Sequence, residues 1–273
     1  MTSLDDDIGS VNWYHTMELA PGLVTPGLFD LRHLPSSMPF PASMRGMRCL
    51  DIATADGFWA FEMERRGAAE VLAIDLEDPL DEDYPGDLER TPRADLGRNR
   101  RTFEVARRAL GSRVERRSMS VYDLRPEATG VFDFVFIGNL LIHLRDPVLA
   151  LAAARTVTRG TLLSFEVVSL GMTILHRRVP AAHLGRIDRV LWWTPNVAAH
   201  NRFLEAAGFR VTASGGPLAQ RWGRGFVRLP LRERLRTPWE AAKHEAFYRL
   251  GIPSHWSLGT PDPSASLRPS ASG

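Results

Sequence analysis

Two aspartates are spaced in a way that suits a nucleoside. Asp51 lies in an apolar run, residues 47–53, that is typical of a buried strand, and Asp75 ends a second such run at residues 71–75. Small residues between them predict a tight turn, followed by a helix at residues 58–66. In dinucleotide-binding enzymes, an acid about 20 residues past such a turn accepts hydrogen bonds from two adjacent ribose hydroxyls. Asp75 is therefore predicted to hold a ribose.

The turn indicates which kind of nucleoside would bind. A pyrophosphate needs glycine backbone pressed against its oxygens at the N-terminus of a helix. Here Ala53 and Ala55 occupy two of the three expected glycine positions, and only Gly57 is a glycine. The turn therefore favours a ligand without phosphates.

This segment resembles motif I of class I S-adenosylmethionine methyltransferases, acid-x-Gly-x-Gly-x-Gly, with Asp51 as the acid. Any α/β domain can open with a strand, a small-residue turn and a helix, so other segments must support the motif. Residues 118–124 resemble the segment that lines the adenine pocket in these enzymes. The resemblance implies S-adenosylmethionine as cofactor, held by Asp51, Ala53, Thr54, Gly57, Asp75, Leu76, Ser120, Val121, Tyr122 and Asn139.

Strands and helices alternate along the rest of the chain. Further strands are predicted at residues 113–117, 132–139 and 161–167, and a helix at Asp146 and Pro147. This order predicts an α/β fold with ligands at the carboxyl edge of a parallel sheet. We expect a Rossmann-like, seven-stranded, mostly parallel sheet with helices on both faces, the class I methyltransferase fold. Its antiparallel edge is expected at residues 210–213 and 225–229.

Three segments give a second resemblance: residues 13–27, 138–147 and 192–196. Together they resemble the family of bacterial tRNA wobble-uridine carboxymethyltransferases, especially its short members. This likeness implies that Trp13 and Thr25 lie at the cofactor.

The chain departs from that family in ways that change the expected chemistry. The tRNA enzymes have a long N-terminal helical region, whereas a dozen residues precede Trp13, so we expect no such domain. They carry a tyrosine before the histidine at the position of Ile142, and a lysine that holds the extra carboxylate of carboxy-S-adenosylmethionine. The single lysine of this chain is Lys243, so ordinary S-adenosylmethionine is the expected cofactor.

Two histidines are candidate catalytic residues, His15 and His143. A methyl sulfonium reacts by in-line displacement, so the protein must align a lone pair behind the methyl group and exclude water. A histidine with a pKa near neutrality could accept the proton that the acceptor loses. His143 follows the fourth strand, and Asp146 is near enough in sequence to orient it. For either histidine, a structural hydrogen bond is the alternative to proton transfer.

The substrate side is predicted from the end of the fifth strand and the segment after it. Glu166 at the strand end, together with Trp192 and Trp193, is expected to contact the acceptor. Residues 77–95 form either a lid over the cofactor or a solvated insertion. We expect a disordered N-terminus at 1–10, an entry segment at 11–40, a Rossmann-like domain at 41–230 with an inserted cover at 168–193, a helical extension at 231–256 and a disordered tail at 257–273.

Composition limits the remaining choices. The 273 residues are 44% hydrophobic, enough for a full core, and carry a net charge of +2 and one cysteine. These values and the lack of a membrane segment or signal peptide predict a cytoplasmic protein without disulfides. The eight histidines are scattered, so we predict no metal site. Arginines lie on solvated helix faces, which does not favour nucleic acid as a partner.

The predicted function is methyl transfer to the oxygen, nitrogen or carbon of a small molecule such as a specialised metabolite. Two alternatives stay open, a tRNA-modifying methyltransferase or carboxymethyltransferase and a non-catalytic module that binds the cofactor. Sequence does not fix the acceptor atom or the oligomeric state.

Overall fold

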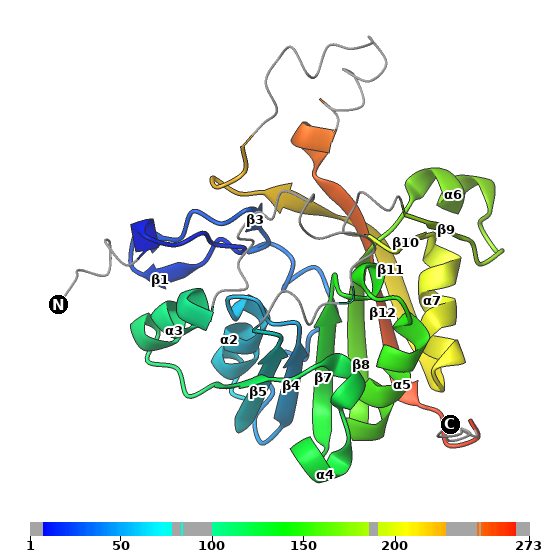
Figure 1. Cartoon of the computed structure of the whole chain (residues 1–273), viewed down its shortest axis with the longest axis horizontal. Coiled ribbons are helices and arrows are strands. Elements are labelled where there is room, and N and C mark those ends of the chain that lie inside the picture. The colour runs from blue at the N-terminus through cyan, green and yellow to red at the C-terminus, as the bar shows by residue number, and fades with distance from the viewer. Residues whose placement is uncertain are drawn as a thin grey trace.

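A central eight-stranded sheet organises the molecule, in the order β3-β11-β12-β8-β7-β4-β5-β6 (Figure 1). The computed structural model describes residues 8–77, 83, 100–185, 191–227, 245 and 247–265. The strands of this sheet are β3 (Phe29–Asp30), β4 (Arg48–Ile52), β5 (Glu70–Asp75), β6 (Glu115–Ser118), β7 (Phe132–Gly138), β8 (Thr158–Val167), β11 (Phe209–Trp222) and β12 (Ile252–Pro261).

Strands β6, β5, β4, β7 and β8 pair in parallel, whereas β12 is antiparallel to both β8 and β11. The predicted mostly parallel sheet with helices is confirmed. The short strand β3 pairs with the end of β11 and adds an eighth strand that the sequence did not predict.

Alternation along the strands divides the core into two layers. Cys49 of β4 and Phe134 and Phe136 of β7 join one cluster with α2 (Phe58–Arg65) and α3 (Arg100–Ala109). The alternate positions, such as Leu50 and Ile52, join the other cluster, beneath α5 (Pro147–Val157) and α7 (Val197–Ala206). Because successive strand side chains point to opposite faces, a continuous apolar run covers both sides of the sheet.

Helix starts follow the expected capping chemistry. The Asp146 side chain accepts a hydrogen bond from the Leu149 N–H at 2.8 Å, and Pro147 opens α5. Asn196 caps α7 in the same way, accepting from the Ala199 N–H at 2.8 Å. Other short helices are η2 (Val121–Asp123), α4 (Pro126–Thr129), η3 (Leu141–His143) and α6 (Leu170–Leu175).

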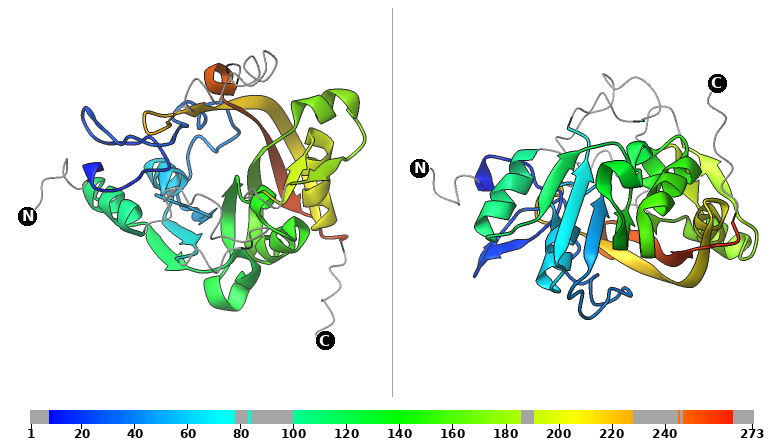
Figure 2. Two further views of the ribbon diagram at one scale, coloured as in Figure 1. Left: turned by 45° about the horizontal axis from the view of Figure 1, so that its top comes forward. Right: turned by 90° about the horizontal axis from the view of Figure 1, so that it is seen from below.

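Two small sheets lie outside the central one. The strands β1 (Glu18–Ala20) and β2 (Leu23–Val24) form a hairpin near α3, on the opposite side of the molecule from α6 and α7 (Figure 2). The strands β9 (Ala182–Leu184) and β10 (Trp193–Pro195) pair within and just beyond the predicted cover. Among the described residues, no helix is long and apolar enough to cross a membrane.

The C-terminal part corrects one prediction. The partner of β11 is β12, at residues 252–261, and not residues 225–229. β12 is a central strand with neighbours on both sides, so the predicted boundary at 256/257 falls inside it. Its buried faces carry small or polar side chains, including Ser254 and Ser257, and therefore lack the apolar signal of the other strands.

A polar cluster is buried between α7 and the sheet. The His200 Nδ1 lies 2.9 Å from the His255 Nδ1, and its Nε2 lies 2.9 Å from the Ser164 hydroxyl. Burial lowers the pKa of His200, with His255 adding to the effect, and burial lowers the pKa of His255 to about 4. Both imidazoles are therefore neutral near pH 7.

Candidate functional site

The candidate site lies at the carboxyl edge of the parallel strands. Asp51 and Asp75 lie at or near the ends of the neighbouring strands β4 and β5, and Ser120 follows β6. Asn139 follows β7, and Glu166 lies near the end of β8. In open α/β sheets this edge is where ligands bind. The strand pairing therefore brings together five of the side chains that the sequence placed at strand ends.

The turn after β4 has the backbone of a glycine loop although it contains alanines. Ala53 has φ 61° and Ala55 has φ 50°, both in the left-handed region, and Gly57 has φ 94°. An alanine in this region costs roughly 1–2 kcal/mol, which glycine avoids. The loop therefore keeps a conformation that its own residues do not favour.

Asp51 is buried beneath this loop. Its Oδ2 accepts hydrogen bonds from the Thr54 hydroxyl at 2.6 Å and from the Ala60 N–H at 3.1 Å. Its Oδ1 is buried and has no hydrogen-bond partner among the described residues. Burial raises the pKa of Asp51 to about 7, and the nearby Asp75 carboxylate adds to this rise. The Asp51 side chain thus has one free acceptor and changes charge near neutral pH.

Asp75 is engaged with the same loop. Its Oδ2 accepts from the Ala55 N–H at 2.7 Å, and its Oδ1 accepts from the Leu76 N–H at 2.9 Å. Leu76 follows β5 directly, so Asp75 and Leu76, both predicted to contact the cofactor, lie beside the loop.

His15 is held under the surface by a partner that the sequence analysis missed. Its Nδ1 is bonded to the Asp56 Oδ1, and the side chain is 4% exposed. The ring also stacks on Phe58, with centroids 5.3 Å apart. Asp56 lies between Ala55 and Gly57 in the sequence. A charged residue inside a turn of small residues was the signal from which a fixed partner for Asp56 could have been predicted.

Trp13 and Thr25 hold the entry segment together. The Trp13 Nε1 donates to the Ile8 carbonyl at 3.0 Å. The Thr25 hydroxyl donates to the His15 carbonyl at 2.7 Å and accepts from the Met17 N–H at 2.8 Å. Both side chains are buried, so these hydrogen bonds within the segment explain their positions without a ligand.

The predicted adenine segment forms the 3-10 helix η2. The Ser120 hydroxyl accepts from the Tyr122 N–H at 3.3 Å, and Val121 is buried against the α5 layer. The Tyr122 hydroxyl donates to the Asp83 Oδ2 at 3.0 Å. Burial raises the pKa of the Tyr122 phenol.

Asp83 also contacts the predicted cover. Its Oδ2 accepts from the Arg145 N–H at 2.6 Å, and its carbonyl accepts from the Trp192 Nε1. The Trp193 Nε1 donates to the Arg145 carbonyl at 3.2 Å. Apart from residues 77 and 83, the predicted lid at 77–95 lies outside the described residues.

Asn139 is oriented by a second amide. It has φ 52°, and its Nδ2 donates to the Gln220 Oε1 at 2.8 Å. The Gln220 Nε2 donates in return to the Asn139 Oδ1 at 2.9 Å and to the Ser254 hydroxyl at 2.6 Å. This network joins the ends of β7 and β11 to the start of β12. Sequence reasoning missed Gln220, because its partners are more than 30 residues away.

Glu166 is placed beneath η3 and is fully buried. Its Oε1 accepts from the N–H groups of Leu140 and Leu141, each at 2.9 Å. Its Oε2 is buried without a hydrogen-bond partner among the described residues, and burial raises the pKa of Glu166 to about 8. The observed contacts make it a cap of η3, which contains the half-buried His143.

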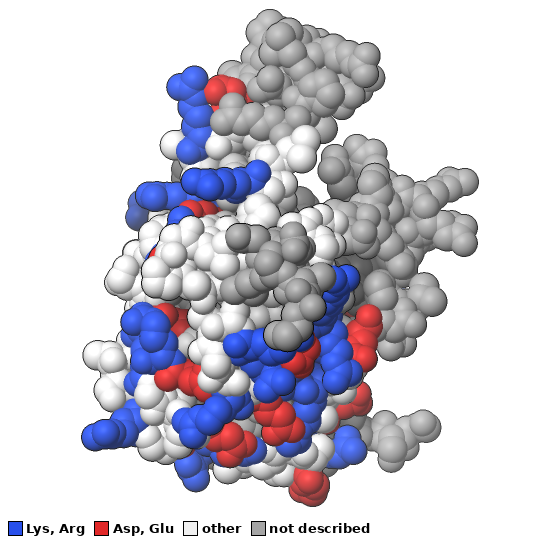
Figure 3. All heavy atoms as spheres, turned by 90° about the vertical axis from the view of Figure 1, so that its left-hand side faces the viewer, with Lys and Arg blue, Asp and Glu red and all other residues white. Residues whose placement is uncertain are grey.

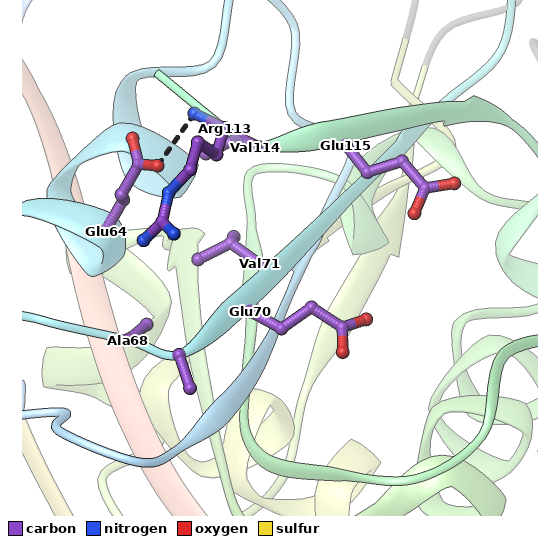
Figure 4. Close-up of a pocket in the computed structure, with 8 residues that line it drawn as sticks. Glu64, Ala68, Glu70, Val71, Arg113, Val114 and Glu115 are labelled. Atoms are coloured by element: carbon purple, nitrogen blue, oxygen red, sulfur yellow. Dashed lines mark hydrogen bonds between the residues drawn. The ribbon is translucent and has the colours of Figure 1, made fainter. Parts of the chain in front are cut away.

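Two pockets lie in different places. One, of about 160 Å³, opens at the amino ends of β5 and β6, where Glu64 accepts from the Arg113 N–H at 2.8 Å (Figure 4). It is at the opposite edge of the sheet from the candidate site. The other, of about 320 Å³, lies at the carboxyl edge and is lined by Arg221, Trp222, Gly223, Phe226, Tyr248, Arg249 and Gly251.

Charges are mixed on the face shown in Figure 3, where basic and acidic side chains interleave. Ion pairs such as Arg107 with Glu104 at 3.0 Å and Arg117 with Glu115 at 2.6 Å occupy several arginines. Such pairing leaves fewer cations for a phosphate backbone.

Within the described part of the chain, no group of three or more histidine, cysteine or acidic side chains could hold a metal ion.

The residues at the edge fit S-adenosylmethionine. The unpartnered Asp51 Oδ1 is an acceptor for an amino group, and Asp75 lies at the next strand end, where a ribose would be held. The left-handed backbone at Ala53 and Ala55 retains the shape of the glycine loop.

Comparisons with known proteins agree on the fold. No family model and no curated protein matches the sequence. The chain is similar to the N-terminal domain of EvdMO1, solved in the presence of SAH and D-fucose, with TM-score 0.53, 17% identity and coverage of 94% of this chain and 95% of that chain. A chain in the complex of the Haloferax volcanii Trm112 methyltransferase activator with a candidate methyltransferase gives TM-score 0.53 and 13% identity, over 85% and 88% of the two chains.

The cyclase SpnF is also similar, with TM-score 0.50, 17% identity and coverage of 80% of this chain and 76% of that chain. At these identities the likeness concerns the arrangement of strands and helices. The chain therefore has the fold of the class I S-adenosylmethionine-dependent methyltransferases.

Proposed function

We propose that this protein transfers a methyl group from S-adenosylmethionine to a small-molecule acceptor. The observation that carries the proposal is the Asp51 Oδ1, a buried acceptor without a partner among the described residues, at the start of a loop with left-handed backbone. A buried acceptor without a hydrogen bond is costly, so a cationic donor from a ligand would satisfy it.

When bound, S-adenosylmethionine supplies an electrophilic methyl group on a sulfonium. Asp51 would accept a hydrogen bond from its amino group, and Asp75 would hold the ribose. Ser120, Val121 and Tyr122 would line the adenine. Asn139, fixed by Gln220, lies at the same edge and would contact the cofactor and orient the acceptor. Any proton that the acceptor loses would pass to His143 or to water.

The acceptor is proposed to be a small molecule, a specialised metabolite. The EvdMO1 domain was solved with SAH and a sugar, D-fucose, and matches 94% of this chain. The mixed charges on the face in Figure 3 do not favour a nucleic acid. One observation favours a second candidate, a cofactor-binding protein without methyl transfer, because the cyclase SpnF shares the fold.

Calorimetry with S-adenosylhomocysteine and, separately, with NADH tests the cofactor. We expect saturable heat with the first ligand alone. Saturation by NADH and no heat with S-adenosylhomocysteine would overturn the proposal.

Incubation with radiolabelled S-adenosylmethionine, a panel of small phenols, acids, amines and sugars, and bulk tRNA then separates the candidates. Label in a small molecule supports the proposal, label in tRNA assigns an RNA enzyme, and binding without any transfer supports the non-catalytic protein.

A further inference from the structure

Asp56 belongs to the loop after β4, but its side chain bonds to another segment. Its Oδ2 accepts from the backbone N–H groups of Tyr14 and His15, each at 2.9 Å. Its Oδ1 is bonded to the His15 Nδ1. The Asp56 side chain is fully buried. Both carboxylate oxygens of a loop residue are thus engaged with residues about 40 positions earlier in the chain.

The segment that Asp56 holds is itself fixed to the far edge of the sheet. The Phe29 N–H donates to the Tyr14 carbonyl at 2.9 Å, and the Thr16 N–H donates to the Phe29 carbonyl at 2.8 Å. Phe29 lies in β3 and pairs with Trp222 at the end of β11. The contact is close, because a Cβ on Gly27 would overlap the His15 carbonyl carbon. A continuous set of contacts therefore runs from the loop to the edge strands.

This anchor and the strained loop are adjacent. Ala55, with φ 50°, directly precedes Asp56, and Ala53 has φ 61°. Glycine would adopt these angles without help, whereas alanine adopts them only where surrounding contacts outweigh the steric cost. The described side-chain contacts of this loop include those of Asp56, the hydrogen bond from the Ala55 N–H to Asp75 and that from the Thr54 hydroxyl to Asp51, and those of Asp56 join the loop to the N-terminal segment.

We propose that Asp56 and His15 are positioning residues, which keep the alanine loop in its cofactor-binding conformation without touching the cofactor. The inference rests on the proposed function, since it assumes that this loop holds S-adenosylmethionine. It assigns His15 a role through Asp56 in place of proton transfer. Glycines would adopt the left-handed backbone of this loop without strain. In this chain the contact between Asp56 and His15 stabilises that backbone at the alanines.

The test compares two substitutions at one position. In His15→Asn, the amide nitrogen stands where the imidazole Nδ1 stood and can still donate to Asp56, whereas His15→Leu removes the donor. We expect the affinity for S-adenosylhomocysteine to fall at least about ten-fold in His15→Leu and to stay within about three-fold of wild type in His15→Asn. Equal affinity of folded His15→Leu and wild type would overturn the proposal. Where His15→Leu does not fold, His15→Phe takes its place, because it keeps a ring against Phe58 and likewise has no donor for Asp56.

A double-mutant cycle separates positioning from a general structural role. Ala53→Gly with Ala55→Gly should restore most of the affinity lost in His15→Leu, measured against the same glycine pair in an otherwise wild-type chain. A purely structural role of His15 predicts no such rescue. Failure of the glycine pair to restore binding in a folded variant would contradict the inference.

Amide hydrogen exchange without any cofactor keeps the two proposals distinguishable. The Ala55 N–H donates to Asp75, and the Gly57 N–H donates to the Thr54 carbonyl at 2.9 Å. Both amides should exchange at least about ten-fold faster in His15→Leu, while Ile52 in β4 serves as the unchanged control. If the wild type binds no S-adenosylhomocysteine, the proposed function fails, and equal exchange at Ala55 and Gly57 would overturn the positioning role.

Discussion

At the scale of single residues, the carboxyl group of Asp51 combines nearly complete burial with one unused acceptor oxygen. Burial raises its pKa to about 7, and the amino group of S-adenosylhomocysteine is cationic at this pH. An ionised Asp51 accepts a hydrogen bond from that cation more strongly than a neutral one. Asp51 is thus predicted to make cofactor affinity depend on pH around neutrality.

Affinity for S-adenosylhomocysteine should rise about ten-fold from pH 6 to pH 8, because the ionised fraction of a group with a pKa of about 7 rises by that factor. In Asp51→Asn the affinity should be lower at pH 8 and nearly constant over this range. Calorimetry at three pH values measures both. An Asp51→Asn protein that keeps the wild-type pH profile would contradict the assignment.

Glu166 is the second buried carboxyl group, and it should act on stability. Burial raises its pKa in the folded protein to about 8, against an ordinary value of 4.5. The folded state then binds the proton more tightly, so this contribution is fully present below pH 4.5 and is lost as the pH rises toward 8. Within that window the loss is on the order of 1 kcal/mol per pH unit.

Glu166→Gln keeps the shape and an oxygen for the Leu140 and Leu141 amides but does not titrate. Between pH 6 and pH 8, the free energy of unfolding of the wild type should fall relative to that of the variant. Urea unfolding at pH 6, 7 and 8 measures the difference, in which the titration of Asp51 cancels. Parallel pH profiles of the two proteins would rule out a buried neutral Glu166.

Sequence patterns located these residues, but could not give their contacts. Asp51 and Asp75 were predictable because apolar runs and small-residue turns have a local signature. Asp56 and Gln220 were not, because their partners are 41 and 81 residues away along the chain. Nor could the burial of Glu166 and His15 be predicted, because it depends on which segments cover the strand ends.

At the scale of elements, α7 is joined to β8 and β12 by the buried cluster of Ser164, His200 and His255. The pKa values of both histidines are lowered in the folded protein, His255 to about 4, against an ordinary value of 6.5. The unfolded chain then binds protons first as the pH falls. Stability from this cluster is therefore present above pH 6.5 and is lost toward pH 4.

Replacing the pair with uncharged groups should reduce that acid sensitivity. In His200→Gln with His255→Gln, the fall in unfolding free energy between pH 6.5 and pH 4 should be smaller than in the wild type by on the order of 1 kcal/mol or more. The variant will be less stable at pH 7, so the comparison uses the slope of the unfolding free energy against pH. Each free energy comes from a denaturant titration. Identical slopes of unfolding free energy against pH in the two proteins would show that the pKa values of the histidines are not lowered by folding.

The elements divide into those with a pattern in the sequence and those without. Strands β4, β5, β7 and β8 are apolar on both faces and were predicted to within a few residues. The sequence of β12 is polar and contains two prolines, because the positions of this strand that face the core carry small side chains. Its position follows from strand pairing across the whole chain, which a local pattern does not encode.

At the scale of the whole molecule, β12 completes the sheet. It lies between β8 and β11 and hydrogen-bonds to both. A chain that ends at residue 251 would leave two long strands with unpaired edges and would open the layer beneath α7. A chain that ends at residue 265 keeps β12 and the hydrogen bond from the Asp262 N–H to the Gly208 carbonyl at 2.9 Å.

The shorter truncation product should lack a cooperative thermal transition and bind S-adenosylhomocysteine at least about 100-fold more weakly than the full chain. The chain ending at 265 should match the full chain in both respects. Circular dichroism and calorimetry measure the two properties. A cooperatively folded chain ending at 251 would show that β12 is dispensable.

The antiparallel slot of β12 also has a consequence during protein synthesis. Every other strand of the central sheet precedes it along the chain, so a ribosome delivers β8 and β11 while the space between them is still empty. Folding domains generally assemble as units during translation. Helix α7 can therefore pack fully against the sheet only after β12 has been synthesised. Until then the unpaired edges of β8 and β11 are accessible to chaperones and to neighbouring nascent chains.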